Sequence, residues 1–244
     1  MTHINSWSLS TFYPYATQNM GEVGMKAEVN YRVPKTNAML GGTFISLKYA
    51  SAFALNSTVK DSTSAGIVIE EEVKLFDVAK DADGKKQKNF EEFYFEASKK
   101  LDKKNKLTVA YMLTYYNTEL YAGIKSDAGS IINAHLAVAE WKHKIKRKKS
   151  FRAELQHLWS DQVDVDQEGN WLMGLAEYSS NGYFVAFQNL FNYGHSKKQL
   201  HYPTISAGFT KGTTKFMATY GQQRAGLFCI GGVCRTVPAS DGLT

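Results

Sequence analysis

The residues from Glu22 to Val33 alternate between apolar and polar side chains without a break, and this pattern constrains the fold more than any other feature. Such a run with a period of two residues indicates a β-strand with one apolar and one polar face. The run is longer than a usual strand of about five or six residues, and it matches the roughly nine to eleven residues that cross a bilayer at a tilt. The apolar set is Val23, Met25, Ala27, Val29, Tyr31 and Val33, and the polar set is Glu22, Gly24, Lys26, Glu28, Asn30 and Arg32.

Similar alternating runs continue to the end of the chain. Together they predict about eleven strands, with a twelfth beginning at Gly242, and no convincing helix. The fold class expected is therefore all-β, an antiparallel up-and-down meander in one domain that spans residues 1–244. The runs lie near Trp7–Tyr13, Glu22–Val33, Thr43–Tyr49, Phe93–Ala97, Leu107–Tyr115, Ile132–Val138, Phe151–Trp159, Trp171–Leu175, Val185–Phe191, Ile205–Phe209 and Phe216–Tyr220.

The connections between these runs are alternately short and long, so all long connections fall at one end of the sheet. This asymmetry is typical of an outer-membrane barrel, which has short periplasmic turns and long outer loops. A soluble β-sandwich has no reason to keep it. The pattern predicts a transmembrane β-barrel of about 12 strands in the cell outer membrane. The short connections are 34–38, 99–105, 142–149, 179–182 and 211–214, and the long ones are 51–88, 117–130, 161–169, 193–200 and 225–241.

The charges follow the same asymmetry, within a net charge of +6. Lysines cluster in the short connections 99–106 and 142–149, while many acidic residues lie in the long ones. The run His143–Lys149 could bind nucleic acid, but it forms the tip of a hairpin without the shared aromatic face that nucleic-acid modules use. We favour a contact with an anionic membrane surface, where each Lys or Arg is worth about 1 kcal/mol.

The polar rows of the strands supply candidate residues for the lumen of a barrel. They carry both signs, which favours internal ion pairs over a pore selective for one charge. The alternative is that they are ordinary solvent-facing residues of a water-soluble sheet. The lumen-facing candidates are Glu22, Lys26, Glu28, Arg32, Lys48, Glu92, Glu96, Arg152 and Glu154.

No motif indicates catalysis, a cofactor or a metal ion. The run Asp164–Gly169 resembles the start of a calcium loop, but Leu175 stands where the bidentate Glu belongs. The histidines lack metal-ligand spacing, and His135 is expected on a polar strand face toward the lumen. No phosphate-binding loop or dinucleotide fingerprint is present. We therefore expect a non-enzymatic protein without a cofactor, with a barrel enzyme acting on lipid as a weaker alternative.

The two cysteines, Cys229 and Cys234, are separated by four residues that include two glycines. This is not the Cys-x-x-Cys spacing of a redox motif, and the basic context that activates a thiol is lacking. A structural disulfide in an oxidising compartment is the expected state. Closing so small a loop stabilises a protein by about 2 kcal/mol in the chain-entropy model.

The stretch from Gly221 to Ser240, GQQRAGLFCIGGVCRTVPAS, resembles the C-terminal end of an uncharacterised family of Bacteroidetes-type outer-membrane β-barrel proteins. Members of that family are longer at the N-terminus, and a further strand usually ends their chains. The resemblance implies an outer-membrane location and the C-terminal portion of a longer barrel. It implies no catalytic or ligand-binding residue.

Two functions from different classes remain open. The first is a non-enzymatic outer-membrane barrel, a passive channel or a surface scaffold, whose partners are membrane lipid and a surface protein. Its apolar rows would contact lipid, and Trp7, Trp141, Trp159 and Trp171 would serve interfacial girdles. The second is a soluble or secreted β-barrel or sandwich that binds a ligand in its interior. The two differ in which face of the strands meets lipid or water.

Overall fold

The computed structural model describes residues 7–13, 15, 21–37, 39–62, 68–80, 83–117, 131–161, 169–194, 199–224, 226–230 and 233–243. For 57–62, 68–75, 215, 226–230 and 233–236 it describes the backbone alone. The chain folds into antiparallel β-strands and one short 3₁₀ helix, η1 (Ser8–Thr11). The all-β prediction is therefore confirmed.

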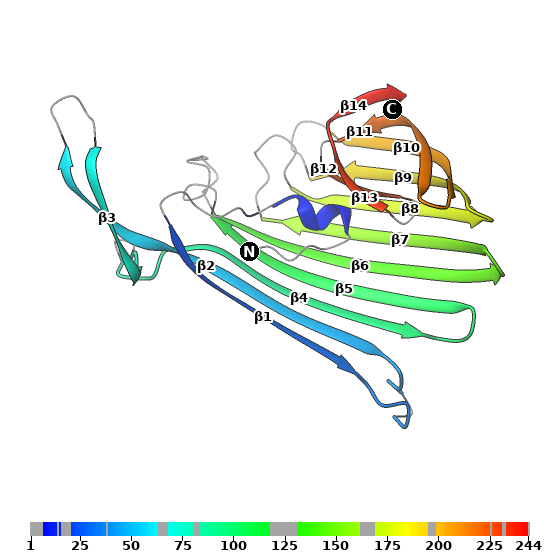
Figure 1. Cartoon of the computed structure of the whole chain (residues 1–244), viewed down its shortest axis with the longest axis horizontal. Coiled ribbons are helices and arrows are strands. Elements are labelled where there is room, and N and C mark those ends of the chain that lie inside the picture. The colour runs from blue at the N-terminus through cyan, green and yellow to red at the C-terminus, as the bar shows by residue number, and fades with distance from the viewer. Residues whose placement is uncertain are drawn as a thin grey trace.

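The strands form one large sheet and one small one (Figure 1). The large sheet has 12 strands, of which eleven lie in the order β1-β2-β4-β5-β6-β7-β8-β9-β10-β11-β14 while β3 pairs with β2 alone. The small sheet is the hairpin β12-β13. The strands are β1 (Glu22–Arg32), β2 (Phe44–Ser62), β3 (Val68–Val78), β4 (Lys88–Lys100), β5 (Asn105–Asn117), β6 (Ile131–Lys146), β7 (Lys149–Ser160), β8 (Trp171–Ser180), β9 (Tyr183–Asn192), β10 (Leu200–Lys211), β11 (Thr214–Gln223), β12 (Gly226–Ile230), β13 (Val233–Val237) and β14 (Ser240–Leu243).

The large sheet curves strongly but is not closed into a barrel. Among the residues that the structure describes, its outermost strands, β1 and β14, each pair on one side only, and they lie apart in Figure 1. The prediction of about 12 strands in a meander is confirmed, whereas the prediction of a closed barrel is wrong for this chain. Alternation within strands predicts a sheet and its two faces, but it carries no information about whether the last strand meets the first.

The five connections that the sequence predicts to be short lie at one end of the sheet, which we call the turn end. They are the segments 33–43, 101–104, 147–148, 181–182 and 212–213. Two of the long connections were wrongly predicted as loops, because 51–88 holds the extension of β2 and the strand β3, and 225–241 holds β12 and β13. The β2-β3 hairpin projects from the opposite end, the loop end (Figure 1).

The segment near Trp7–Tyr13, predicted as a strand, instead forms η1. Hydroxyl groups explain the difference, because Ser10 Oγ donates to Trp7 O at 2.7 Å and Thr11 Oγ1 donates to Ser8 O at 2.9 Å. Such local bonds compete with the pairing of an extended strand. Within the described residues, no helix combines the length and the apolar character needed to cross a membrane.

The segment containing η1 packs on one face of the sheet, which we call the inner face; the other is the outer face. Trp7 Nε1 donates to the Tyr94 hydroxyl at 2.9 Å, and the backbone N–H of Leu9 donates to Gln156 Oε1 at 2.9 Å. The hydrophobic core lies between η1 and this face. Its fully buried apolar side chains are Leu9, Phe90, Ile132, Leu136, Leu158, Trp171 and Met173.

Two apolar rows that the sequence assigned to the lipid side therefore lie on the inner face. They are Ile132–Val138 in β6 and Trp171–Leu175 in β8, whose alternate side chains are buried. The physical reason is the apolar cover from the segment that contains η1. The ring of Phe12, the residue after η1, meets Trp171 edge-on with centroids 5.0 Å apart. A separate segment of chain changes the environment of a strand without changing its periodicity.

Candidate functional site

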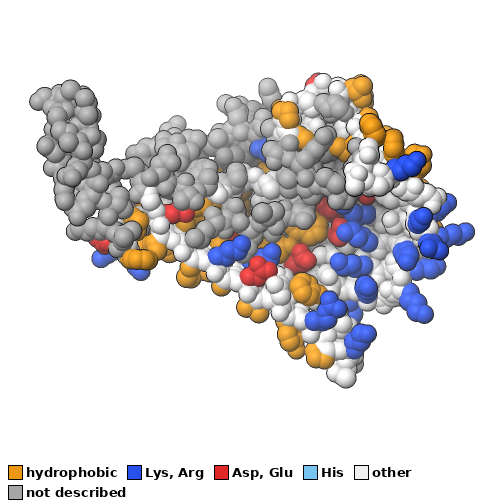
Figure 2. Space-filling view, viewed as in Figure 1, with side chains coloured by type: hydrophobic (Ala, Val, Ile, Leu, Met, Phe, Trp, Pro, Cys, Tyr) orange, Lys and Arg blue, Asp and Glu red, His pale blue; other side chains and the backbone are white. Residues whose placement is uncertain are grey.

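The outer face is apolar and uncovered along most of the sheet. In β5, Leu107, Val109 and Leu113 are exposed, while the intervening Thr108 and Ala110 are buried on the inner face. The exposed fraction of the side chain is 61% for Val29 and 54% for Phe187. Hydrophobic side chains line the lower edge of the molecule in Figure 2. Further exposed members of this face are Met25, Tyr31, Leu47, Phe93, Leu155, Leu172, Val185, Ile205, Phe216 and Tyr220.

A band of aromatic and histidine rings crosses the outer face toward the loop end. His135 Nδ1 lies 2.8 Å from the Tyr111 hydroxyl, and the His135 ring stacks on Trp159 with centroids 5.7 Å apart. His157 continues the band beside Trp159 at 4.8 Å. We call this the loop-end band. Its members are Tyr111, His135, His157, Trp159, Phe191, Tyr193 and His201.

His135 thus belongs to the outer face, and its predicted place on a lumen-facing row is wrong. The sequence pattern around it misleads because Ile132, Leu136 and their neighbours face η1 instead of lipid. The four tryptophans, all predicted to lie in girdles, also occupy both faces of the sheet. Trp141 and Trp159 lie on the outer face as predicted for a girdle, whereas Trp7 and Trp171 are buried on the inner side.

A second band of rings crosses the outer face near the turn end. Trp141 lies beside His143 at 5.5 Å and beside Phe151 at 6.1 Å. On later strands, Phe209 stacks on Phe216 at 5.1 Å and lies 6.0 Å from Tyr183. We call Trp141, His143, Phe151, Tyr183, Phe209 and Phe216 the turn-end band.

The separation of the two bands is somewhat smaller than the height of the apolar belt of a membrane barrel. On β9, Tyr183 belongs to the turn-end band and Phe191 to the loop-end band. Eight residues at about 3.3 Å each separate them by roughly 26 Å along the strand, or roughly 20 Å along the normal of a membrane at a tilt of about 40°. Outer-membrane barrels carry an apolar belt about 25 Å tall between aromatic girdles.

The inner face carries ion pairs formed by several of the predicted lumen residues. Glu28 and Lys48 are directly opposite on β1 and β2, with a carboxylate-to-ammonium distance of 4.0 Å. Arg152 approaches Glu154 at 3.0 Å and Glu140 at 3.5 Å. Since Glu140 and Glu154 are almost fully buried, the guanidinium between them offsets much of the cost of burying two carboxylates.

The remaining predicted lumen residues lie apart from this cluster. Glu96 accepts a hydrogen bond from the Tyr94 hydroxyl at 2.5 Å, and Glu92 is buried on the same face of β4. Glu22 accepts a hydrogen bond from Tyr15. The remaining two, Lys26 and Arg32, are exposed on β1.

Sequence reasoning missed Glu140, which contacts Arg152 and also Lys142 at 3.0 Å. The alternating run that the sequence predicts in this strand ends at Val138. Continuing it by two residues places Glu140 in the same row as Ala134 and Val138, on the inner face. That this row lies beside Arg152 and Glu154 follows from the register of β6 against β7, and the sequence alone does not give this register.

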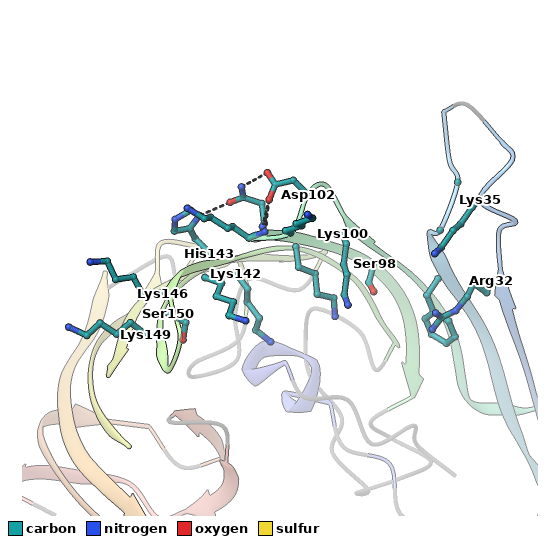
Figure 3. A pocket seen from close by; sticks show the side chains of 18 of the residues that line it. Arg32, Lys35, Ser98, Lys100, Asp102, Lys142, His143, Lys146, Lys149 and Ser150 are labelled. Atoms are coloured by element: carbon teal, nitrogen blue, oxygen red, sulfur yellow. Dashed lines mark hydrogen bonds between the residues drawn. The ribbon is translucent and has the colours of Figure 1, made fainter. Parts of the chain in front are cut away.

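A basic cavity opens at the turn end, with a volume of about 1740 Å³. Eleven of its lining side chains are Lys or Arg, and a single one, Asp102, is acidic. Figure 2 shows Lys and Arg gathered over this end of the molecule, and Figure 3 shows the cavity itself. We call it the lysine basin. Its basic residues are Arg32, Lys35, Lys100, Lys103, Lys104, Lys106, Lys142, Lys144, Lys146, Lys148 and Lys149.

Asp102 is engaged in the turn between β4 and β5 and does not pair with a lysine side chain. Its carboxylate accepts bonds from the backbone N–H groups of Lys104 at 2.6 Å and Asn105 at 2.8 Å, and from Asn105 Nδ2 at 2.6 Å. The Asn105 side chain, followed by the backbone N–H groups, lowers the pKa of Asp102. The dashed bonds in Figure 3 show this arrangement.

The backbone of the β12-β13 hairpin pairs Cys229 directly with Cys234. Directly opposite residues in an antiparallel pair have Cα atoms about 4.5 to 5.5 Å apart, within the span that a disulfide bridges. The side chains of both cysteines lie outside the described part of the chain, so the disulfide stays a prediction. The acidic stretch Asp164–Glu168 also lies outside it. Among the residues that the structure describes, no group of three His, Cys, Asp or Glu could hold a metal ion.

A family model matches the whole chain, residues 1–244, and its description is a family of unknown function, DUF6029. The chain belongs to the DUF6029 family. This membership supports the predicted likeness to an uncharacterised family, while its description names neither an organism group nor a membrane barrel. No curated protein and no solved structure was found to match the chain.

Proposed function

We propose that this DUF6029 protein is a non-enzymatic protein of the cell outer membrane, whose outer face lies in lipid. The observation that carries the proposal is the uncovered apolar outer face between two bands of aromatic rings. Each large apolar side chain removed from water contributes about 1.5 to 3 kcal/mol. Large apolar side chains left in water on each strand of the path from β1 to β11 exceed the apolar patches of ordinary soluble proteins.

The competing function, a soluble barrel or sandwich with an internal ligand, fits the faces less well. A sandwich buries its apolar rows between two sheets, whereas Leu155, Phe187 and Ile205 are each more than half exposed. The inner face carries the ion pairs and the lysine basin. These charged groups share the inner face with the hydrophobic core, so a soluble sheet would leave the apolar outer face without cover.

Within the membrane proposal, the interior favours a scaffold over an open channel. Trp7, Leu9, Tyr13 and Tyr15 are buried against the inner face at the loop end. Tyr15 stacks on Phe90 at 4.8 Å, which fills space that a channel would leave to water. The lysine basin then forms a blind opening at the turn end.

Refolding of the full chain into detergent micelles tests the membrane assignment. We expect a folded form that migrates differently from the heated form on SDS gels and that inserts into lipid vesicles. A monomer that is folded in plain buffer and ignores vesicles would contradict the assignment. Planar-bilayer recordings then separate the two membrane functions, because a scaffold gives no steady conductance and a passive channel does.

A further inference from the structure

Four cationic side chains form one row across the inner face at the turn end. The strand registers place Lys100 directly opposite Lys106, Lys106 opposite Lys142, and Lys142 opposite Arg152. Like charges that face each other across a β-sheet destabilise it. Negative charge from elsewhere would therefore stabilise a row of four on adjacent strands.

Carboxylates of the chain supply that charge at only one end of the row. Glu140 and Glu154 lie beside Arg152, and Glu140 also reaches Lys142. Lys100 and Lys106 have no ion pair with any acidic side chain in the described chain, and the one acid of the basin, Asp102, is bound to backbone N–H groups. The positive charge of Lys100 and Lys106 is thus uncompensated.

The row is accessible from water. The Lys142 side chain is 48% exposed, and Lys100, Lys106 and Lys142 all line the lysine basin. Figure 3 shows Ser98, Lys100 and Lys142 reaching from the strands into the concave side of the sheet. Since these side chains lie on the inner face, a bilayer around the outer face cannot contact them. The lysines at the turn tips are not shielded from a bilayer in this way.

We propose that Lys100, Lys106 and Lys142 bind a soluble anion that carries several phosphate groups. Charge-assisted hydrogen bonds from ammonium groups to phosphate oxygens are among the stronger protein contacts, and the hydroxyls of Ser98 and Ser150 lie in the same basin to donate further bonds. A chain of phosphates matches a linear row of cations better than a single phosphate does. The site extends the proposed function and stands without it, because the basin opens to water whatever covers the outer face.

Calorimetric titration of the refolded full chain with tripolyphosphate tests this site. Lys100→Gln/Lys106→Gln removes two charges from the row, and Arg147→Gln/Lys211→Gln removes two charges from turn tips that do not line the basin. We expect the row variant to bind about tenfold more weakly or worse, and the tip variant to change affinity by less than about threefold. The charge-preserving variant Lys100→Arg/Lys106→Arg should keep most of the affinity.

Equal losses in the row and tip variants would mean diffuse attraction to a basic surface and would overturn the site. Binding to vesicles of anionic phospholipid without binding to tripolyphosphate would assign the charge to a membrane surface and overturn it as well. Far-UV circular dichroism and heat-modifiable migration check that each variant folds. If the double row variant does not fold, Lys100→Gln alone is compared with Arg147→Gln, with the same expected order of affinities.

Discussion

At the scale of single residues, a glycine lets an aromatic ring of the neighbouring strand lie close to the backbone. Gly208 in β10 faces inward, and a Cβ atom there would lie 2.8 Å from Phe184 Cε1 and closer still to the backbone oxygen of Phe216. Gly174 in β8 has nothing within 4 Å of the same position. The two glycines therefore differ in what a methyl group would meet, although both lie within strands.

We expect Gly208→Ala to destabilise the folded protein by about 1 to 3 kcal/mol, because backbone and ring must move apart. Gly174→Ala is the matched control and should leave stability almost unchanged. Urea unfolding in detergent micelles, followed by tryptophan fluorescence, measures both. Equal stabilities of the two variants would contradict the close packing at Gly208.

Asp102 provides a pH-dependent contact at the turn end. Its pKa is lowered in the folded protein, so its contribution to the turn is complete above the ordinary Asp value of about 3.9 and is lost as the pH falls through the lower, folded value. The Asn105 side chain is the largest cause. Asn105→Ala should raise the pKa of Asp102 toward its ordinary value, as read from an NMR titration of the carboxylate. A titration midpoint that stays in place would refute this role of Asn105.

At the scale of elements, periodicity predicted what lies within each strand and failed where a second segment intervenes. For β1 and β5 the alternation assigned both faces correctly, because nothing covers their outer side chains. For β6 and β8 it assigned the apolar rows to the wrong face, because η1 covers them and both faces of these strands carry apolar residues. Local sequence cannot report a contact such as that between Leu9 and Gln156, which are 147 residues apart.

The lysine basin, too, can be predicted from the sequence only in part. The sequence shows two lysine-rich turns, and alternating connection lengths place both at one end. That Lys106 stands opposite both Lys100 and Lys142 follows only from the registers of three strands. A one-residue slip would move these side chains to the other face.

A substitution at Phe187 distinguishes lipid from water around the strands, because this residue lies on β9 between the two aromatic bands and is 54% exposed. In a bilayer, Phe187→Lys should cost about 2 to 4 kcal/mol, as expected for a lysine near the midplane. Thr213→Lys, in the turn between β10 and β11, is the control and should cost little. Unfolding titrations in lipid vesicles measure the difference. An unchanged or more soluble Phe187→Lys protein would indicate that water covers this face.

The β12-β13 hairpin tests the oxidation state of the cysteines. We expect mass spectrometry of the unreduced protein to find a chain two hydrogens lighter than the reduced one. Cys229→Ser/Cys234→Ser should lose about 2 kcal/mol of stability at most, since the loop is short. Two free thiols in the native protein would refute the bond.

At the scale of the whole molecule, the number of strands excludes an all-antiparallel closure through the two edges of the sheet. Eleven strands lie on the path from β1 to β14, and every neighbouring pair is antiparallel. With an odd number, β1 and β14 run in the same direction, whereas the antiparallel barrels of bacterial outer membranes have an even number. A closure of that kind requires a further strand between β1 and β14. The exposed edge of β1 is a template for pairing with another chain.

We expect the full chain refolded alone in detergent to associate through its open edges. Light scattering after size exclusion should give particles with more than one 27.3 kDa chain per micelle. Ala27→Cys, on the edge strand β1, should then form disulfide-linked dimers readily, whereas Ala139→Cys, also exposed but on the central strand β6, should not. Both variants are made in Cys229→Ser/Cys234→Ser protein, so that only the new thiol reacts. Particles that hold one chain each, with equal cross-linking at both positions, would show that the edge of β1 is covered within the chain itself.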